Sequence, residues 1–229
     1  MPRLLSILRA QPHADPIRDD AEVRRLYRGW RMRVMTSTMV GYAAFYLVRK
    51  NFSMAMPSFL TDLGYSKVDL GFILSLFSVL YGIGRFANGV IADRSNPRFF
   101  MAAGLICAAA VNVLFGMSSG LAAFGLFWVM NAWFQSMGFP PCARLLSQWF
   151  SPGERGTTWS LWNASHQIGG AGIFILAGWL IPAYGWRSAF FVPAAAAAVV
   201  AFFLVWRLRD TPQSLGLPPV EEYRGEASH

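Results

Sequence analysis

Six long apolar runs, separated by short polar connections, occupy most of the chain. They lie near residues 34–60, 68–92, 98–118, 121–149, 156–183 and 187–207. Each run has roughly 20 residues or more, which is the length that an α-helix needs to cross a hydrocarbon core of about 30 Å. The runs do not alternate between apolar and polar positions, so they predict helices and not the strands of a barrel. The pattern therefore predicts an all-α membrane protein with six transmembrane helices.

Composition separates this prediction from a soluble fold. Hydrophobic residues make up 55% of the 229 residues and charged residues only 14%, whereas a soluble domain carries about a quarter charged residues. A single soluble helical domain with an unusually apolar core is the alternative. The regular recurrence of runs of bilayer length favours membrane helices instead.

The sequence has no pattern typical of an enzyme, a cofactor site or a metal centre. Cys107 and Cys142 fall inside separate apolar runs, so we interpret them as small apolar residues and not as disulfide partners or metal ligands. The stretch GIGRFA at 82–87 has the form of the dinucleotide motif G-x-G-x-x-A. That motif requires a preceding strand in a soluble βαβ unit. Inside an apolar run, its glycines favour close helix packing.

Positive charge is distributed unequally between the two sides of the predicted membrane segments. The net charge is +8, and eight arginines precede the first run. In the connections, one side has only Lys67 and Arg187, whereas the side of the N-terminal arginines has Arg94, Arg98, Arg155, Arg207 and Arg209. Because cytoplasmic loops carry the excess of Lys and Arg, both termini are expected in the cytoplasm. This distribution is unlike the exposed basic stripe of a nucleic-acid-binding protein, so no nucleic-acid partner is expected.

These features divide the chain into three predicted parts. Residues 1–33 form a basic cytoplasmic segment, and residues 34–207 form the six-helix transmembrane bundle. Residues 208–229 are polar and rich in proline, and they are interpreted as the start of a cytoplasmic linker.

Charged residues inside the runs are all positive. No carboxylate lies in the interior of any run, and Asp93 and Glu154 both fall in connections; the cations are Arg49, Lys50, Arg85 and Arg144. A charge inside a membrane is costly and usually faces a cavity or a partner. With no acid within the runs, an anionic ligand is the candidate counter-ion. For Arg85 and Arg144, extension of the side chain to the headgroups is an equal alternative, and Arg144 could also bond to a neighbouring helix end.

Arg49 belongs to a polar stripe on the first predicted helix. Tyr42, Tyr46 and Ser53 lie seven residues before, three before and four after it, which places them on one face. Two phenols, a guanidinium and a hydroxyl are unsuited to contact lipid, so we expect this face to line a polar cavity. Lys50 points about 100° away from Arg49 on a helix and need not face the same space.

Two further polar faces lie on the fourth and fifth predicted helices. In the fifth, Trp162 and His166 are four residues apart, and a hydrogen bond to a neighbouring helix is the alternative role for the histidine. A second pair four residues apart, Asn163 and Gln167, lies beside them. In the fourth, Asn131, Gln135 and Gly138 repeat in the same way, with Trp133 alongside and the pair Pro140–Pro141 predicting a kink.

One connection carries a recognisable signature. The stretch GVIADRSNPR at 89–98 resembles the loop between the second and third helices of the major facilitator superfamily, with a good fit at Gly89, Asp93, Arg94 and Arg98. Four other stretches, GYAAFYLVRKNFSMAMP, NAWFQSMGFPPCAR, LWNASHQIGGAG and RDTPQSLGLPPVEEY, resemble the organophosphate:phosphate antiporter family within it. Inside that family the similarity is greatest to the bacterial glycerol-3-phosphate transporters, and it covers residues 24–224.

The resemblance implies a transporter of two six-helix bundles in a bacterial inner membrane. Such a protein would exchange inorganic phosphate for a phosphomonoester by alternating access. The matching positions imply that Arg49 binds phosphate, with Lys50, Tyr42, Tyr46, His166 and Trp162 around it, and that Asp93 and Arg94 belong to a conformational-switch loop. We place Trp133 in the same binding group, on the polar face of the fourth helix.

The chain also departs from the family pattern. Arg85, Phe45 and Gln167 stand where Lys, Tyr and Asn are common, which leaves the choice of substrate open. A second phosphate-binding arginine belongs to the C-terminal bundle, which these residues do not include, so a second six-helix bundle is an expected partner. A hexose phosphate substrate, or a membrane receptor that senses a sugar phosphate without transport, fits the same motifs.

Overall fold

The computed structural model describes residues 11–225 as helices joined by short connections. Its long helices are α2 (Asp20–Asp62), α3 (Lys67–Arg94), α4 (Pro97–Met117), α5 (Leu121–Ser136), α6 (Phe139–Trp149), α7 (Arg155–Tyr184) and α8 (Ser188–Arg207). Short turns of 3-10 helix follow α6 and α8 (Pro152–Glu154 and Gln213–Leu215), and α9 (Val220–Arg224) ends the described chain. No strand occurs within residues 11–225, so the predicted all-α class is confirmed.

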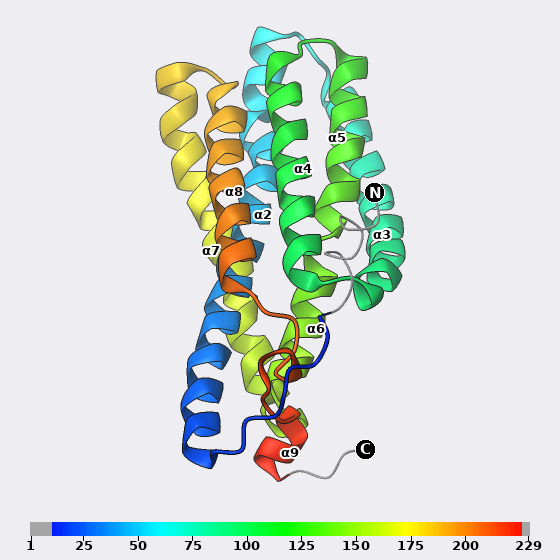
Figure 1. The fold of residues 1–229 in the computed structure, drawn as a ribbon. Helices are drawn as coiled ribbons and strands as arrows, with labels where there is room; N and C mark the ends of the chain where they lie inside the picture. The colour runs from blue at the N-terminus through cyan, green and yellow to red at the C-terminus, as the bar shows by residue number, and fades with distance from the viewer. Residues whose placement is uncertain (1–10, 226–229) are drawn as a thin grey trace.

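The long helices lie roughly parallel to one another and alternate in direction (Figure 1). Helix α2 packs along α7 and α8, α4 lies between α8 and α5, and α3 packs on α5 and α6. The start of α2 and the short helix α9 lie at the same end of the bundle, and the other end of α2 lies at the opposite one (Figure 1). The arrangement is the up-and-down bundle that short connections favour.

The fourth predicted span is divided into two helices. Helix α5 ends at Ser136 and α6 begins at Phe139, so the break falls at Met137 and Gly138. Pro140 and Pro141 occupy the start of α6. The N–H groups of the first turn have no partner within a helix, so the missing N–H groups of the two prolines cost no helical hydrogen bond there. The kink predicted from this proline pair is confirmed, and α5 and α6 together make one rod.

Helix α2 is longer than its apolar run and contains one break of its own. It begins at Asp20, well before residue 34, and the Asp19 side chain caps it by accepting a hydrogen bond of 2.9 Å from the Ala21 N–H. Its regular dihedral angles fail inside only at Val48, where φ is −96° and ψ is 15°. The break lies directly before Arg49.

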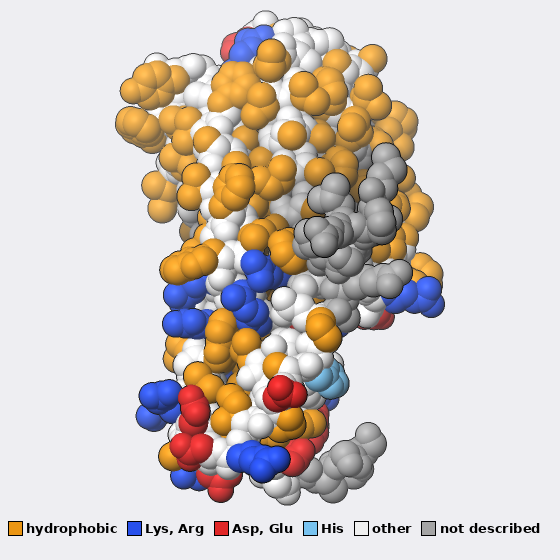
Figure 2. All heavy atoms as spheres, viewed as in Figure 1, with side chains coloured by type: hydrophobic (Ala, Val, Ile, Leu, Met, Phe, Trp, Pro, Cys, Tyr) orange, Lys and Arg blue, Asp and Glu red, His pale blue; other side chains and the backbone are white. Residues whose placement is uncertain are grey.

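An apolar belt surrounds the bundle. Side chains such as Phe86, Phe72 and Ile175 are 81%, 64% and 72% exposed, and Figure 2 shows apolar side chains covering most of the surface away from the charged end. Four helical segments of the described chain have the length and mean hydropathy of membrane spans: Lys67–Arg94, Pro97–Met117, Pro152–Tyr184 and Ser188–Arg207. The first and fourth predicted spans are not among these four segments. Helix α5 has only 16 residues before its break, and α2 carries two cations in its middle.

At the charged end, a buried ion pair fixes three elements together. The Arg144 guanidinium on α6 lies 3.0 Å from the Asp210 carboxylate after α8, and Asp210 is fully buried. The same guanidinium donates to the carbonyls of Ala92, Asp93 and Ser95 at the end of α3, at 3.0, 3.0 and 2.7 Å. Of the alternatives for Arg144, the bond to a helix end is therefore the correct one. Burial raises the pKa of the Asp210 carboxyl above its usual value, against the opposing effect of Arg144.

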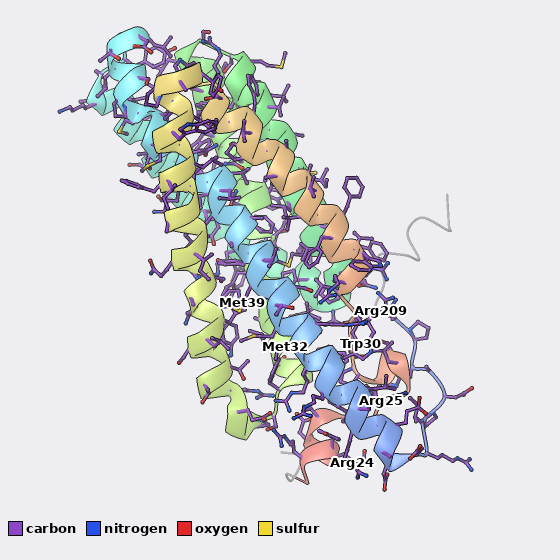
Figure 3. The ribbon with its side chains drawn as sticks, turned by 90° about the vertical axis from the view of Figure 1, so that its left-hand side faces the viewer. Arg24, Arg25, Trp30, Met32, Met39 and Arg209 are labelled. Carbon is purple, nitrogen blue, oxygen red and sulfur yellow. The ribbon has the colours of Figure 1, made fainter. Side chains whose placement is uncertain are left out.

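The chain after α8 packs against the first turns of α2. The rings of Tyr27 and Tyr223 stack 4.0 Å apart, and the Tyr27 hydroxyl donates to the Pro218 carbonyl at 2.6 Å. Arg209 lies beside Trp30 (Figure 3), with its guanidinium carbon 5.5 Å from the ring centroid. The predicted basic segment and the predicted linker are thus in direct contact.

The ion pair of α6 yields a prediction about stability. We expect Arg144→Met to lower the free energy of unfolding by about 3–5 kcal/mol, because the fully buried Asp210 carboxylate then lacks its counter-ion. The matched control is Arg25→Met, which breaks an exposed pair with Glu22 and should cost at most about 1 kcal/mol. Thermal unfolding in detergent measures both. Equal losses for the two variants would show that the buried pair has no special weight.

Candidate functional site

Arg49 lies among aromatic rings of α2 and α3. Its guanidinium carbon is 4.2 Å from the centroid of Tyr81, 5.4 Å from that of Phe77 and 5.7 Å from that of Tyr46. The side chain is half-buried, and it forms no hydrogen bond or ion pair with any of residues 11–225. The ring faces attract the cation, but they accept none of its N–H groups in a strong bond. All five donors of the guanidinium therefore remain available.

His166 on α7 completes a cluster with the two tyrosines of α2. Its ring centroid lies 4.7 Å from Tyr42 and 5.2 Å from Tyr46, and Trp162 packs edge-on at 5.1 Å. Its Nδ1 is 3.1 Å from the Asn163 carbonyl oxygen of the same helix. A carbonyl only accepts, so this nitrogen carries the proton, and the Nε2 of the neutral ring is an acceptor without a hydrogen bond among residues 11–225.

The aromatic cluster connects Arg49 to a second cation. Tyr42 packs edge-on against Phe139 of α6 at 6.3 Å, and the guanidinium carbon of Arg85 on α3 lies 3.7 Å from the Phe139 ring centroid. The sequence leaves two roles for Arg85: extension to the lipid headgroups or a place in a binding site. It is half-buried against this ring, on the same helix as Tyr81 and four residues away from it.

A glycine of α7 brings His166 close to α2. A Cβ added to Gly169 would lie 2.5 Å from the Ala43 carbonyl oxygen and 2.7 Å from the Tyr46 Cβ. No other residue allows the two backbones to approach so closely, so Gly169 sets the distance between the histidine and the tyrosines. Gly84 has the same role between α3 and α5, where an added Cβ would lie 2.7 Å from the Ser136 Oγ. The interpretation of both glycine-rich stretches as helix contacts is confirmed at these two positions.

The structure brings together Tyr42, Tyr46, Arg49, Trp162 and His166. Trp162 is fully buried behind the tyrosine and histidine rings, so it supports them from inside the bundle. The structure does not bring the other two predicted binding residues into this cluster. Lys50 is exposed and has no charged partner in the described chain, and Trp133 is 40% exposed with no ring contact to the cluster.

The four residues of the predicted switch loop lie at the charged end of α3 and the start of α4. Gly89 and Asp93 line a groove of about 740 Å³ together with Arg85 and Arg144. Arg94 is exposed at the last position of α3, and Arg98 is half-buried in the first turn of α4 over the ring of Phe99. Asp93 enters the contacts of Arg144 only through its backbone carbonyl.

Sequence reasoning missed Tyr81, Phe77 and Phe139, which supply the rings against the two cations. Tyr81 could have been predicted from the sequence, because it lies four residues before Arg85 and so shares its helix face. Phe77, four residues earlier again, continues the stripe. Phe139 carries no such signal, since its place depends on the break between α5 and α6.

The arrangement of charges and donors is suited to binding an anion. It combines two guanidinium groups that have no carboxylate partner within residues 11–225 with the Nε2 of a histidine, which accepts from a protonated ligand oxygen or, in the charged ring, donates to an anionic one. No group of three or more His, Cys, Asp or Glu side chains that could hold a metal occurs in the part of the chain that the structure describes. Phosphate suits such a set, because a guanidinium presents two parallel donors to two phosphate oxygens.

Comparison with known proteins identifies the class. Residues 38–228 match the sequence profile of the Major Facilitator Superfamily. A solved bacterial homologue of the human lysosomal transporter Spinster, inward-facing and unoccupied, has the same fold, with a TM-score of 0.68 at 20% identity over 80% of this chain and 44% of its own. The chain therefore belongs to the Major Facilitator Superfamily and is not an enzyme.

Three relatives narrow the position within that superfamily. A "Probable hexose phosphate transport protein" of Chlamydia trachomatis is 50% identical over 93% of this chain and 47% of its own length. The "Membrane sensor protein UhpC" of Escherichia coli is 45% identical (98% and 51%), and the "Glycerol-3-phosphate transporter" of Bacillus subtilis is 42% identical (97% and 51%). The resemblance to the organophosphate:phosphate antiporter family is confirmed. The chain spans about half the length of these relatives.

The close contact of α2 and α7 yields a test of the site's geometry. We expect Gly169→Ala to lower the free energy of unfolding by about 1–3 kcal/mol, since the added methyl group must displace the Ala43 backbone. Phosphate binding should weaken with it, because His166 moves away from the tyrosines. The matched control is Gly170→Ala, where an added Cβ has no neighbour within 4 Å. Thermal unfolding and calorimetric titration with phosphate measure both effects, and similar results for the two variants would contradict the assignment.

Proposed function

We propose that this chain forms one half of a transporter that exchanges a phosphorylated small metabolite for inorganic phosphate. The observation that carries the proposal is the Arg49 guanidinium, which is half-buried in the bundle and has no hydrogen bond or ion pair among residues 11–225. An unpaired charge in a membrane protein is retained where it serves binding or transport. A phosphate group is the counter-ion whose geometry suits it.

Exchange follows from the charge of the site. The site carries the charges of Arg49 and Arg85, which the rings of Tyr46, Tyr42 and Phe139 connect through successive contacts. A bound phosphate neutralises that charge and so changes the relative stability of the inward-open and outward-open states. Phosphate and a phosphomonoester carry the same group, so each can make this change. The loaded transporter then reorients more readily than the empty one, which produces exchange.

We propose that a second bundle completes the transporter and that the protein lies in a bacterial inner membrane. The relatives are about twice as long as this chain, and alternating access in this superfamily involves two bundles that rock around a shared site. We place the protein in a bacterial inner membrane with both ends of this chain in the cytoplasm, on the basis of the arginines gathered at one end.

The substrate has two candidates. The motifs of the sequence favour glycerol 3-phosphate. The identities of 50% to a hexose phosphate transport protein and 45% to a membrane sensor, against 42% to a glycerol-3-phosphate transporter, favour a hexose phosphate or a sensing role. Arg85, Phe45 and Gln167, which depart from the family pattern, leave the choice between these candidates open.

The central residue can be tested by a charge-preserving change. We expect Arg49→Lys in the complete gene product to reduce phosphate exchange in proteoliposomes by about a hundredfold or more, because an ammonium cannot hold two phosphate oxygens in the planar geometry of a guanidinium. The matched control is Arg24→Lys, an exposed position near the start of the same helix, which should leave exchange unchanged. Wild-type exchange in Arg49→Lys, with equal amounts of protein in the membrane, would refute the role of Arg49.

A second experiment separates the substrates. Proteoliposomes loaded with inorganic phosphate are offered labelled glycerol 3-phosphate or glucose 6-phosphate in parallel. We expect uptake of one of them in exchange for internal phosphate. Uptake of glucose 6-phosphate alone would favour the second candidate. If either compound binds and neither is taken up, the protein is a sensor, and the proposal of transport is contradicted.

A further inference from the structure

The break in α2 at Val48 has a definite structural cause. In a regular helix the Val48 carbonyl would accept from the N–H of Phe52. Here that N–H donates to the Oδ1 of Asn51 at 3.0 Å, and the backbone at Val48 has left helical geometry. Helix breaks without proline arise where a side chain enters the backbone ladder. The Asn51 amide is that side chain.

The Val48 carbonyl is bound by three amide groups from other helices. The Val48 oxygen accepts from the Nδ2 of Asn112 on α4 at 3.0 Å, from the Nδ2 of Asn131 on α5 at 3.0 Å and from the Nε2 of Gln135 on α5 at 3.3 Å. A carbonyl oxygen has only two lone pairs. It therefore has no capacity left for another donor, and in particular none for the neighbouring Arg49.

The amides also bond to one another. The Nδ2 of Asn51 donates to the Oδ1 of Asn112 at 2.7 Å and to the Ala189 carbonyl of α8 at 3.1 Å. All four amide side chains, Asn51, Asn112, Asn131 and Gln135, are buried. A straight apolar α2 would need no such cluster, and a buried polar group that loses its partner is costly. The cluster therefore specifies the break and not merely the packing of helices.

The position of the break connects it to the binding group. Val48 directly precedes Arg49, so its dihedral angles set the direction in which the Arg49 side chain leaves α2. The occupied carbonyl also keeps the guanidinium from forming a bond within its own helix. We infer that Asn112, Asn131 and Gln135 are positioning residues for phosphate: they hold α2 open at Val48 so that Arg49 faces the aromatic cluster with its donors unpaired. This inference rests on the proposed function of Arg49.

Removal of one amide at a time tests the inference in the complete gene product. We expect Asn131→Leu, which has nearly the same shape and no donor, to raise the Kd for inorganic phosphate by about tenfold or more, and Gln135→Met to raise it by a smaller factor, since its bond is the longest. The matched control is Asn88→Leu. Asn88 is a buried amide that donates to the Ser136 hydroxyl at 2.6 Å and makes no contact with Val48. It should lower thermal stability and leave the Kd within about twofold. If Asn131→Leu fails to fold, Gln135→Met decides.

A second experiment, a thiol-labelling arm, measures the exposure of residue 49 and needs no phosphate. Cys107 and Cys142 are replaced by alanine and Arg49 by cysteine, and the rate of reaction with a negatively charged, water-soluble thiol reagent is measured. Adding Asn131→Leu or Gln135→Met should slow this reaction severalfold or more, because residue 49 turns away from the polar side of α2; adding Asn88→Leu should not. If phosphate binds to the wild type and the amide variants match the control in both arms, the inference is overturned. If the wild type binds no phosphate, the proposed function fails, and the thiol arm alone decides whether the amides position residue 49.

Discussion

The proposed site depends on a positive charge that no group within residues 11–225 neutralises. Arg49 has rings on several sides and no acid or carbonyl partner within residues 11–225. Aromatic faces stabilise a cation by about 0.5–2 kcal/mol, which is far less than a charge loses when it leaves water. The remaining cost is tolerable only where water or an anion reaches the guanidinium. We propose that Tyr42, Tyr46, His166 and Arg85 meet that requirement, since they belong to the ring contacts around Arg49.

Two arginines of the bundle, Arg49 and Arg144, differ in how their charge is paired. Arg144 has a carboxylate and three carbonyls around it and holds α3, α6 and the segment after α8 together. Arg49 has no hydrogen bond or ion pair within residues 11–225, and the neighbouring Val48 carbonyl is already occupied by three amide donors. The number of bonds that a guanidinium makes inside the protein thus distinguishes a structural arginine from one available to a ligand.

The sequence predicted much of this and missed the parts that depend on contacts between helices. Run length and hydropathy predict the helices, and the spacing of Tyr42, Tyr46 and Arg49 predicts their shared face, because both are properties of one helix. The acid partner of Arg144 lies beyond the last run, at Asp210, and only the fold brings the two together. Asn131 and Gln135 were visible as a polar stripe, but their target is a backbone carbonyl of another helix. Lys50 is grouped with the site by the family resemblance and Trp133 by its place beside a polar helix face; within residues 11–225 both are exposed and make no contact with the aromatic cluster.

The most direct test of the account is an experimental structure of the complete gene product in the presence of inorganic phosphate. The account predicts a phosphate with two oxygens about 2.7–2.9 Å from two guanidinium nitrogens of Arg49, with α2 still broken at Val48. A phosphate bound elsewhere, with Arg49 turned towards lipid or paired with a carboxylate, would contradict it.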